Sequence, residues 1–479
     1  MPEMPGALRR SLRFALLTVA GLVGTIALLE LSIELVLRNP SVVRLIDTPQ
    51  QINHLKNYYL GYDRSIVQFR SDCAVYDEVL TYRLRPGVSC TVANREHSVD
   101  YAINRAGLRD TDDKLIDPAI IVTGDSQAMG WGVAAAETVS SRVEALTGRK
   151  TLNAAISSYE TAREMSLLRE LIQPSTQYVV VAYCDNDYYG NWGSVASGEL
   201  PLMDRAAYER AASEWTSKSR YFPFKHVSKL SQSVIRSFSK PTLPAIRQRP
   251  GFAAMSFLAI IDANRDLLRG RHLIVFDVNG FNRNDATFST ALREAASRSD
   301  LFAAVASMHV IDASSLLTND DYYMLDDHMR PSGHDKIARE IASIVGGEKR
   351  WRVEAAPGSV VASPGEAVVG RADILHRKGA LTVIYGWAAH PKTGEPPASV
   401  SLLRDGIKLA EVEPVLPRDD VVKDLKNPLA RYTGFALAVR SDSIASRQKV
   451  ELIATWPDRS TGTIANIADA LLRLNNGGV

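Results

Sequence analysis

The sequence predicts an α/β protein, with a membrane helix before the α/β unit and a β-sandwich after it. Three observations predict this arrangement. Residues 14–29 form an apolar run without a charge. Between about residues 118 and 346, short apolar runs alternate with helical patterns, which is typical of a parallel sheet covered by helices. After Trp351 the pattern alternates as in antiparallel strands joined by turns, which indicates a sandwich.

The N-terminal segment is predicted to be a membrane anchor. As a helix, residues 14–37 reach about 36 Å, more than a hydrocarbon core of about 30 Å. Arg9, Arg10 and Arg13 precede the apolar run, so the positive-inside rule leaves residues 1–13 in the cytoplasm. We therefore expect a single-pass protein of a bacterial inner (cytoplasmic) membrane, with its body on the periplasmic side. A cleaved signal peptide is the alternative, although no clear A-x-A site follows the run.

Residues 38–115 are expected to be an exported N-terminal segment, and they hold two of the three cysteines. Cys73 and Cys90 flank a stretch that contains Tyr, Arg and Pro and suits a hairpin, and exported proteins keep disulfides. We predict a Cys73–Cys90 bond, with two unrelated buried thiols as the alternative. Cys184 ends an apolar strand, where a small buried residue is expected.

Residues 116–348 are expected to form the doubly wound α/β unit. Its predicted strands are Ala119–Thr123, Thr151–Ala154, Tyr178–Tyr183, His272–Val278 and Met308–Asp312. Its predicted helices lie near Thr138–Leu146, Thr161–Ile172, Thr287–Ser297 and Gly333–Val345. The stretch at about residues 204–268 is too long for a simple crossover. Its aromatic and basic residues indicate an inserted helical lid, and an insertion without function is the alternative.

Residues 349–366 are predicted to be a linker to a β-sandwich at residues 367–479. The predicted strands are Ala380–Ala389, Ala398–Arg404, Leu409–Val415, Gly434–Arg440 and Val450–Trp456, with Asp405-Gly406 as a hairpin turn. No cluster of catalytic residue types occurs in this part of the sequence. Trp387 and Trp456 are either core residues or part of a sugar-binding face.

Polar residues follow the predicted strands, and in an open parallel sheet the carboxyl ends of the strands meet at one edge. These groups are Gly124-Asp125-Ser126, Ile156-Ser157-Ser158, Asp185-Asn186-Asp187 and, before the last helix, Asp326-Asp327-His328. A nucleophilic serine needs a base, and the imidazole needs a carboxylate; Ser126, His328 and Asp326 have these properties. The N–H groups of Ser126 and Ser158 and the side-chain amide of Asn186 are candidate oxyanion donors.

These residues resemble the sequence blocks of the SGNH/GDSL hydrolase family. The matching strings are IIVTGDSQAMGWGV, LNAAISSY, VAYCDNDYYGN and DDHMRPSGHDKIA, and the resemblance covers about residues 75 to 346. It implies a three-layer, flavodoxin-like fold and serine chemistry that needs no cofactor. It further implies that Ser126 is the nucleophile, that Asn186 donates to the oxyanion, and that His328 is the base oriented by Asp326.

Two departures from the family pattern affect the expected site. Ser158 stands where the family usually has glycine, so a positive φ would be costly there. An acid lies two residues before His328 rather than the commoner three, so Asp326 and Asp327 are both candidates. Two-residue spacing is similar to that of alginate-acetylation enzymes, which pair an SGNH-like domain with a carbohydrate-binding β-sandwich. By this analogy the substrate is a glycan.

A divalent metal site is an alternative use of the acidic residues near His328. The candidate ligands would be Asn319, Asp320, Asp321, Asp326 and Asp327 together with His328. The sequence lacks a second histidine or a fixed-spacing metal motif there, so we expect no metal. His334 opens an amphipathic helix, where local capping is expected.

Together these observations predict a serine-dependent ester hydrolase or acyl (acetyl) transferase. It would act on O-acyl groups of a cell-envelope glycan through an acyl-enzyme on Ser126. The alternative is a non-catalytic envelope scaffold or glycan-binding protein that retains the fold. The 56 basic and 54 acidic residues nearly cancel and form no long run of one sign, so nucleic acid is not an expected partner.

Overall fold

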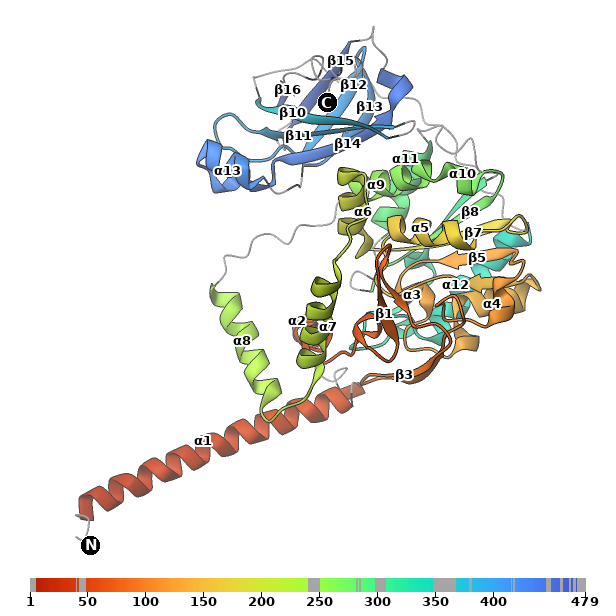
Figure 1. Cartoon of the computed structure of the whole chain (residues 1–479). Helices are drawn as coiled ribbons and strands as arrows, with labels where there is room; N and C mark the ends of the chain where they lie inside the picture. The colour runs from red at the N-terminus through yellow and green to blue at the C-terminus, as the bar shows by residue number, and fades with distance from the viewer. Residues whose placement is uncertain are drawn as a thin grey trace.

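The computed structural model describes most of the 479-residue chain in a few long ranges. These are residues 6–39, 41–42, 49–239, 250–280, 283, 286–297, 307–347, 368–378, 381–414, 416, 418–444, 449–456, 460–464, 467 and 471. Figure 1 shows a long N-terminal helix, an α/β unit and a C-terminal β unit. The predicted linker at residues 349–366 lies outside the described residues, as does the start of the predicted cytoplasmic tail.

The centre of the α/β unit is a five-stranded parallel sheet with the strand order β6-β5-β7-β8-β9. Its strands are β5 (Ile120–Thr123), β6 (Thr151–Asn153), β7 (Tyr178–Cys184), β8 (His272–Val278) and β9 (Ser307–Asp312). The second strand in sequence lies at one edge and the first lies beside it, which is the flavodoxin-like order. The five predicted strands and the α/β class are therefore confirmed.

Helices cover both faces of this sheet, which explains why its strands are continuous apolar runs. On one face, α4 (Val139–Thr147) and α12 (Pro331–Val345) share a core with Val122 and Phe276. On the other face, Ile121 and Val181 share a core with helices that pack against one another. These helices are α5 (Thr161–Leu171), α6 (Asp187–Ser197), α9 (Pro250–Ala263) and α11 (Thr287–Ser297).

The stretch predicted as an inserted lid has two different parts. Helix α9 belongs to the sheet layer, since its Phe257 and Leu258 are buried in the same core as Val179. Together with α6 it covers the sheet in the crossover from β7 to β8, and α10 (Arg265–Leu268) follows it. The added material is α7 (Arg205–Ser219) and α8 (Lys225–Ser239). Helix α7 packs on the N-terminal segment, and α8 packs on the long N-terminal helix α1 and on α2.

The N-terminal segment contains α2 (Pro49–Tyr62) and two small hairpins. The strands are β1 (Ala74–Asp77), β2 (Thr81–Leu84), β3 (Ser89–Ala93) and β4 (Ser98–Ala102). A disulfide joins Cys73 to Cys90, with 5.6 Å between their Cα atoms, as predicted. Cys184 is a buried free thiol at the end of β7, which also agrees with the prediction.

Loss of this disulfide should destabilise the protein. The bond closes a loop with a sequence separation of 17 residues. Since a closed loop limits the freedom of the unfolded chain, replacing Cys73 and Cys90 with serine should lower the free energy of unfolding by about 3 kcal/mol. Denaturant unfolding of the purified full-length chain would measure this difference. A loss below about 0.5 kcal/mol would contradict the expectation.

The C-terminal unit consists of two antiparallel sheets that share one core. Strands β10 (Val369–Lys378), β11 (Leu381–Ala389) and β14 (Gly434–Arg440) form one sheet. Strands β13 (Ile407–Val412), β12 (Ser399–Arg404), β15 (Val450–Thr455) and β16 (Thr461–Ile464) form the other. Phe435 from the first sheet and Leu452 from the second lie in the same hydrophobic cluster. This agrees with the predicted sandwich, although β10 and β16 were not predicted.

Local features of the C-terminal unit follow from its sequence. Asp405 and Gly406 have φ of 49° and 81°, and the residues on either side of them are paired as a hairpin. This is the turn expected of an Asp-Gly pair. Trp456 is buried and therefore a core residue, whereas Trp387 is only half-buried.

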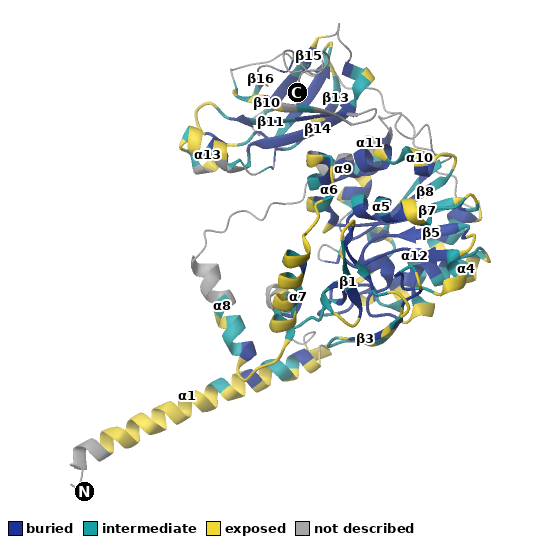
Figure 2. Ribbon diagram, viewed as in Figure 1, coloured by how far each residue is buried: buried dark blue, intermediate teal, exposed yellow. Residues whose placement is uncertain are grey.

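Helix α1 (Gly6–Arg38) extends away from the rest of the molecule (Figure 1). Its segment Arg10–Arg38 is long and apolar enough to cross a membrane, by length and composition. Figure 2 shows that most of this helix is exposed, and its exposed residues include large apolar side chains such as Phe14 and Leu17. Among the described residues it is the one helix with this property.

Candidate active site

Ser126 lies where the sequence places it, at the carboxyl end of β5. It begins the short helix α3 (Ser126–Met129), and the Asp125 carboxylate caps that helix by accepting the Gln127 N–H at 2.8 Å. Gly124 lets this turn lie close to β7, because a Cβ at position 124 would be 2.6 Å from the Cβ of Ala182 in β7. As the first residue of a helix, Ser126 has an N–H without an acceptor inside that helix.

The structure brings Ser126, His328 and Asp326 together in one chain of hydrogen bonds. The Nε2 atom of His328 is 2.7 Å from the Ser126 Oγ. Its Nδ1 atom is 2.5 Å from Oδ1 of Asp326. A carboxylate at Nδ1 holds the proton on that nitrogen, which leaves Nε2 free to accept the serine proton.

Asp326 rather than Asp327 is placed to orient His328. The Asp326 side chain is fully buried, whereas Asp327 Oδ1 is 3.2 Å from the His328 Nδ1 and is partly exposed. The Asp327 carboxylate instead accepts a hydrogen bond from Arg64 at 2.6 Å. The geometry thus distinguishes the two acids that the sequence left open.

Several donors converge on the Asp326 carboxylate. The Tyr59 hydroxyl donates to Oδ2 at 3.0 Å, the Trp131 indole N–H donates to Oδ2 at 3.3 Å, and Arg64 donates to Oδ1 at 3.3 Å. Burial alone would raise the pKa of Asp326, but the charges of His328 and Arg64 hold it well below the usual range. Asp326 is therefore a carboxylate at neutral pH.

His328 has a strongly shifted pKa. Burial alone would lower it, but the charges of Asp326 and Asp327 and their hydrogen bonds raise the pKa of His328 to about 9. The Trp131 ring stacks on the imidazole, with 5.0 Å between the centroids and 18° between the planes. The resting site therefore favours the imidazolium form at neutral pH.

Esterase activity should rise with pH until His328 loses its proton. Only the neutral imidazole accepts the serine proton, and the pKa of His328 is about 9, so kcat/KM for p-nitrophenyl acetate should climb from pH 7 and level off above pH 9. Replacing Asp327 with Asn removes one of the two raising charges and should move this limb to lower pH. A rate that is already level at pH 7 in the wild-type protein would contradict the prediction.

The loop that carries Asp326 and His328 is held by residues from the N-terminal segment and from α3. The Glu96 carboxylate accepts the N–H groups of Met324, Leu325 and Asp326 at 2.7 to 3.0 Å. The Gln127 side chain donates to the Asp327 carbonyl at 2.8 Å. Because the backbone of this loop is tied on two sides, the His328 ring has a fixed approach to Ser126.

The same N-terminal residues connect this loop to α1. Arg95, the neighbour of Glu96, forms a bidentate ion pair with Glu34 of α1 at 2.9 Å and binds Asp63 at 2.6 Å. Asp63 in turn is the neighbour of Arg64. The segment Arg95-Glu96 therefore contacts α1 with its first residue and the candidate catalytic loop, residues 324–328, with its second. The segment Asp63-Arg64 contacts the same loop through Arg64 and reaches α1 through Arg95.

The predicted oxyanion donors lie at the ends of β6 and β7, the strands beside β5. Ser158 has a φ of 59°, the left-handed conformation in which a serine is less favourable than the family's usual glycine. Its hydroxyl accepts a hydrogen bond from Gln68 at 2.9 Å. One N–H of Asn186 donates to the Asp125 carboxylate at 3.0 Å, and an amide has a second N–H to offer. Both side chains are exposed, whereas Ser126 is buried.

The sequence prediction missed the residues that surround the acid and the base. Tyr59, Arg64 and Glu96 come from the N-terminal segment, more than 200 positions before the loop that they contact. Trp131 lies inside the string IIVTGDSQAMGWGV, which also contains Ser126, so its position near the site could have been predicted from the sequence. Each of the others is a single polar residue without a recognisable spacing to the motif blocks.

Three of the residues proposed as an alternative metal site come together in the part of the chain that the structure describes. Asp326, Asp327 and His328 bring ligand atoms within 4.8 Å of one another, but Arg64 already pairs with both acids. Asp321 binds Lys336 at 2.7 Å instead.

His334 and three aromatic residues that follow Asn186 lie in different environments. His334 does not cap its helix as predicted; it is buried in α12, and burial lowers its pKa to about 3. Of the aromatic residues after Asn186, Tyr188 is buried, Trp192 is half-buried and Tyr189 is exposed.

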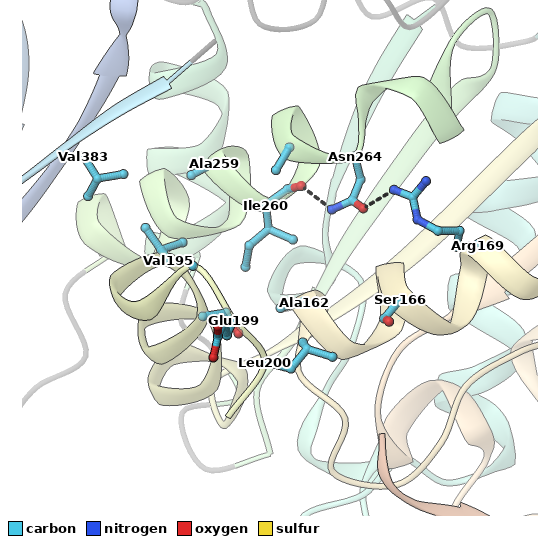
Figure 3. Close-up of a pocket in the computed structure, with 13 residues that line it drawn as sticks. Ala162, Ser166, Arg169, Val195, Glu199, Leu200, Ala259, Ile260, Asn264 and Val383 are labelled. Carbon is cyan, nitrogen blue, oxygen red and sulfur yellow. Dashed lines mark hydrogen bonds between the residues drawn. The ribbon is translucent and has the colours of Figure 1, made fainter. Parts of the chain in front are cut away.

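A cavity of about 170 Å³ lies where the β11 strand approaches the α/β unit (Figure 3). Its walls come from α5, α6, α9 and Val383, and at one end Arg169 donates to Asn264 at 3.1 Å. None of the predicted site residues lines it. It is therefore not the space in which Ser126 would meet a substrate.

Comparisons with known proteins give only remote matches. No protein-family model matches the sequence, and no curated protein matches it. Among solved structures, a protein described as lipolytic and of the G-D-S-L family, from Desulfitobacterium hafniense, is 10% identical, with 47% of this chain and 99% of that chain covered and a TM-score of 0.24. An acetyl xylan esterase from the rumen bacterium Butyrivibrio proteoclasticus is 9% identical, with 48% and 63% covered and a TM-score of 0.24. The fold and site assignments rest on the strand order and the hydrogen bonds described above.

Proposed function

We propose that this protein is a serine-dependent ester hydrolase or acyl (acetyl) transferase with Ser126 as its nucleophile. The observation that carries the proposal is the hydrogen-bond chain from Ser126 through His328 to Asp326. The charges of His328 and Arg64 keep the buried Asp326 ionised, so the site has the base and the orienting acid that acyl transfer requires.

The proposed reaction has two balanced steps. The Ser126 oxygen attacks the ester carbonyl carbon as its proton moves to Nε2 of His328, and the N–H groups of Ser126 and Ser158 and the Asn186 amide stabilise the oxyanion. The C–O bond to the leaving alcohol then breaks, and His328 returns the proton to that alcohol. In the second step, water or a sugar hydroxyl gives its proton to His328 and attacks the acyl carbon. The bond between that carbon and the Ser126 oxygen then breaks, and His328 returns the proton to the Ser126 oxygen.

We propose that the substrate is the O-acylated part of a cell-envelope glycan. Helix α1 is long enough to hold the protein in a bacterial inner membrane, which would put the site on the periplasmic side. Near-neutral charge provides no attraction to polyanions, so recognition of a glycan would depend on hydrogen bonds and on exposed rings such as Tyr189. The C-terminal sheets are a candidate glycan-binding unit in this proposal.

A fluorophosphonate probe tests the proposed nucleophile directly. Purified full-length protein in detergent should be labelled, and peptide mapping should find the label on Ser126, because the probe reacts with an activated serine. His328→Ala should prevent labelling although the serine is present. A protein that is neither labelled nor able to release p-nitrophenol from the acetate ester would contradict the enzymatic proposal and favour the non-catalytic alternative.

Analysis of the envelope distinguishes the two reaction types. Mass spectrometry of the envelope polysaccharide from a strain that lacks this protein should show a change in acetylation. A gain of acetyl groups identifies a hydrolase, and a loss identifies a transferase. An unchanged polysaccharide would contradict the proposed substrate class but not the serine chemistry.

A further inference from the structure

The turn between α7 and α8 presents three aromatic side chains at its surface. Tyr221 is 54% exposed, and Phe222 and Phe224 are each 42% exposed. They surround Pro223, which is also exposed. In Figure 1 this turn lies against α1, away from the central sheet. Large aromatic side chains gathered at one exposed tip mark a contact surface on a soluble body.

Two carboxylates of α1 hold this turn in place. Glu30 accepts the backbone N–H groups of His226 at 3.1 Å and Val227 at 2.9 Å, so it satisfies donors in the first turn of α8. Glu34 Oε2 is 2.9 Å from Nε2 of His226. Glu30 is only 6% exposed, so this contact is an enclosed one. The aromatic turn is therefore fixed beside one level of α1.

That level matches the surface of a bilayer that α1 crosses. From Phe14, the first residue of the charge-free run, to Glu34 the helix rises about 30 Å, which is the thickness of a hydrocarbon core. The large apolar residues before Glu30, such as Phe14 and Leu29, are exposed and would face lipid (Figure 2). Glu34, and the turn that it holds together with Glu30, would then lie at the boundary between hydrocarbon and headgroups.

The chemistry of the turn fits this boundary. Tyrosine and other aromatic rings concentrate at the level of lipid headgroups, where an apolar body and a polar tip are both satisfied. Arg220, which is exposed, directly precedes the aromatic residues, and a cation near a membrane surface is attracted to anionic headgroups. Among the described residues of this turn, we find no comparable indication of a folded protein partner.

We propose that the Tyr221–Phe224 turn is a second membrane contact, with its rings in the interface of the bilayer that α1 spans. This proposal rests on the anchoring function of α1 and goes beyond it. One helix alone lets a body rotate and tilt, whereas a helix and a fixed second contact set its orientation. Because Arg95 and Glu96 connect α1 to the catalytic loop, this contact would also set how the candidate active site faces the membrane.

Depth-dependent quenching tests the proposal with the full-length protein. Phe222→Cys would be labelled with an environment-sensitive nitrobenzoxadiazole dye and reconstituted in vesicles of phosphatidylethanolamine and phosphatidylglycerol that contain nitroxide lipids. Only the new cysteine should react under native, non-reducing conditions, since Cys73 and Cys90 form a disulfide and Cys184 is buried. Phe222 is exposed, so cysteine should be tolerated there.

Two matched positions calibrate the result. Leu22→Cys on exposed α1 reports the hydrocarbon core, and Ile407→Cys on β13, which is 45% exposed and far from α1, reports water (Figure 1). Quenching at position 222 should exceed that at 407 by about twofold or more, with a blue-shifted emission. Quenching at 222 equal to that at 407 would overturn the proposal, because the turn would then lie in water or against a protein and not in the bilayer. An unquenched dye at position 22 would overturn the anchor itself.

Discussion

Replacing Ser126 with alanine should lower kcat/KM for p-nitrophenyl acetate by about 10⁴-fold or more, because the acyl group then has no oxygen on which to form an ester. The expected loss is large since the base cannot compensate: Nε2 of His328 is 2.7 Å from the Ser126 Oγ and would face an unreactive methyl group. Any remaining rate would come from the oxyanion donors and from binding.

Ser231→Ala provides the control for this prediction. Ser231 is exposed on α8, and its hydroxyl donates only to the local Ser228 carbonyl among the bonds described. It should keep wild-type activity. Steady-state rates of both variants, together with their thermal unfolding, separate loss of the nucleophile from loss of the fold. Retention of activity within about 10-fold in Ser126→Ala would place the nucleophile elsewhere.

The central fold could be predicted because its signal is local. Parallel strands buried on both faces appear as short apolar runs, and β8 and α11 have the predicted bounds, His272–Val278 and Thr287–Ser297. The strand β10 was missed because its sequence, VGRADILHRK, mixes charges with apolar residues and begins beyond the linker. Helix α9 was assigned to the insertion although its sequence, PGFAAMSFLAIIDA, is apolar almost throughout, which is typical of a buried helix.

The central residues of the candidate site could also be predicted from short sequence blocks, whereas the residues that surround them could not. Ser126, His328 and the acid lie in short blocks at strand ends, so parallel topology alone brings them to one edge. The choice of Asp326 over Asp327 depended on Tyr59, Trp131 and Arg64, whose contacts reach across 195 to 267 positions. A single tyrosine or arginine in a helix or loop has no pattern that indicates such a partner.

These distant contacts mean that the site is built partly from the membrane-proximal segment. Leu37 of α1 and Leu325, the neighbour of Asp326, lie in one hydrophobic cluster with Tyr58 and Tyr59. Glu34 of α1 reaches the same region through Arg95. A truncation after the apolar run would therefore remove part of the support of the catalytic loop, so activity is best measured on the full-length chain.

Replacing Asp326 with Asn should lower kcat by about 10⁴-fold, with little change in the structure. In the wild-type protein, the Asp326 carboxylate lies 2.5 Å from Nδ1 of His328 and holds a proton on that nitrogen. Tyr59, Trp131 and Arg64 donate to the same carboxylate. An amide offers one oxygen to these donors and turns its N–H groups toward the imidazole. His328 then keeps its proton on Nε2, where it cannot accept the proton of Ser126.

Asp327→Asn is the matched control, since it removes the same charge from the next residue. Its carboxylate lies farther from Nδ1, at 3.2 Å, and binds Arg64, so it should lower kcat by about 10-fold or less once the pH exceeds the pKa of His328. Fluorophosphonate labelling should be slow in Asp326→Asn and nearly normal in Asp327→Asn. Equal losses in both variants would show that the two acids act only through their charge, and would contradict the assignment of Asp326 as the residue that fixes the tautomer.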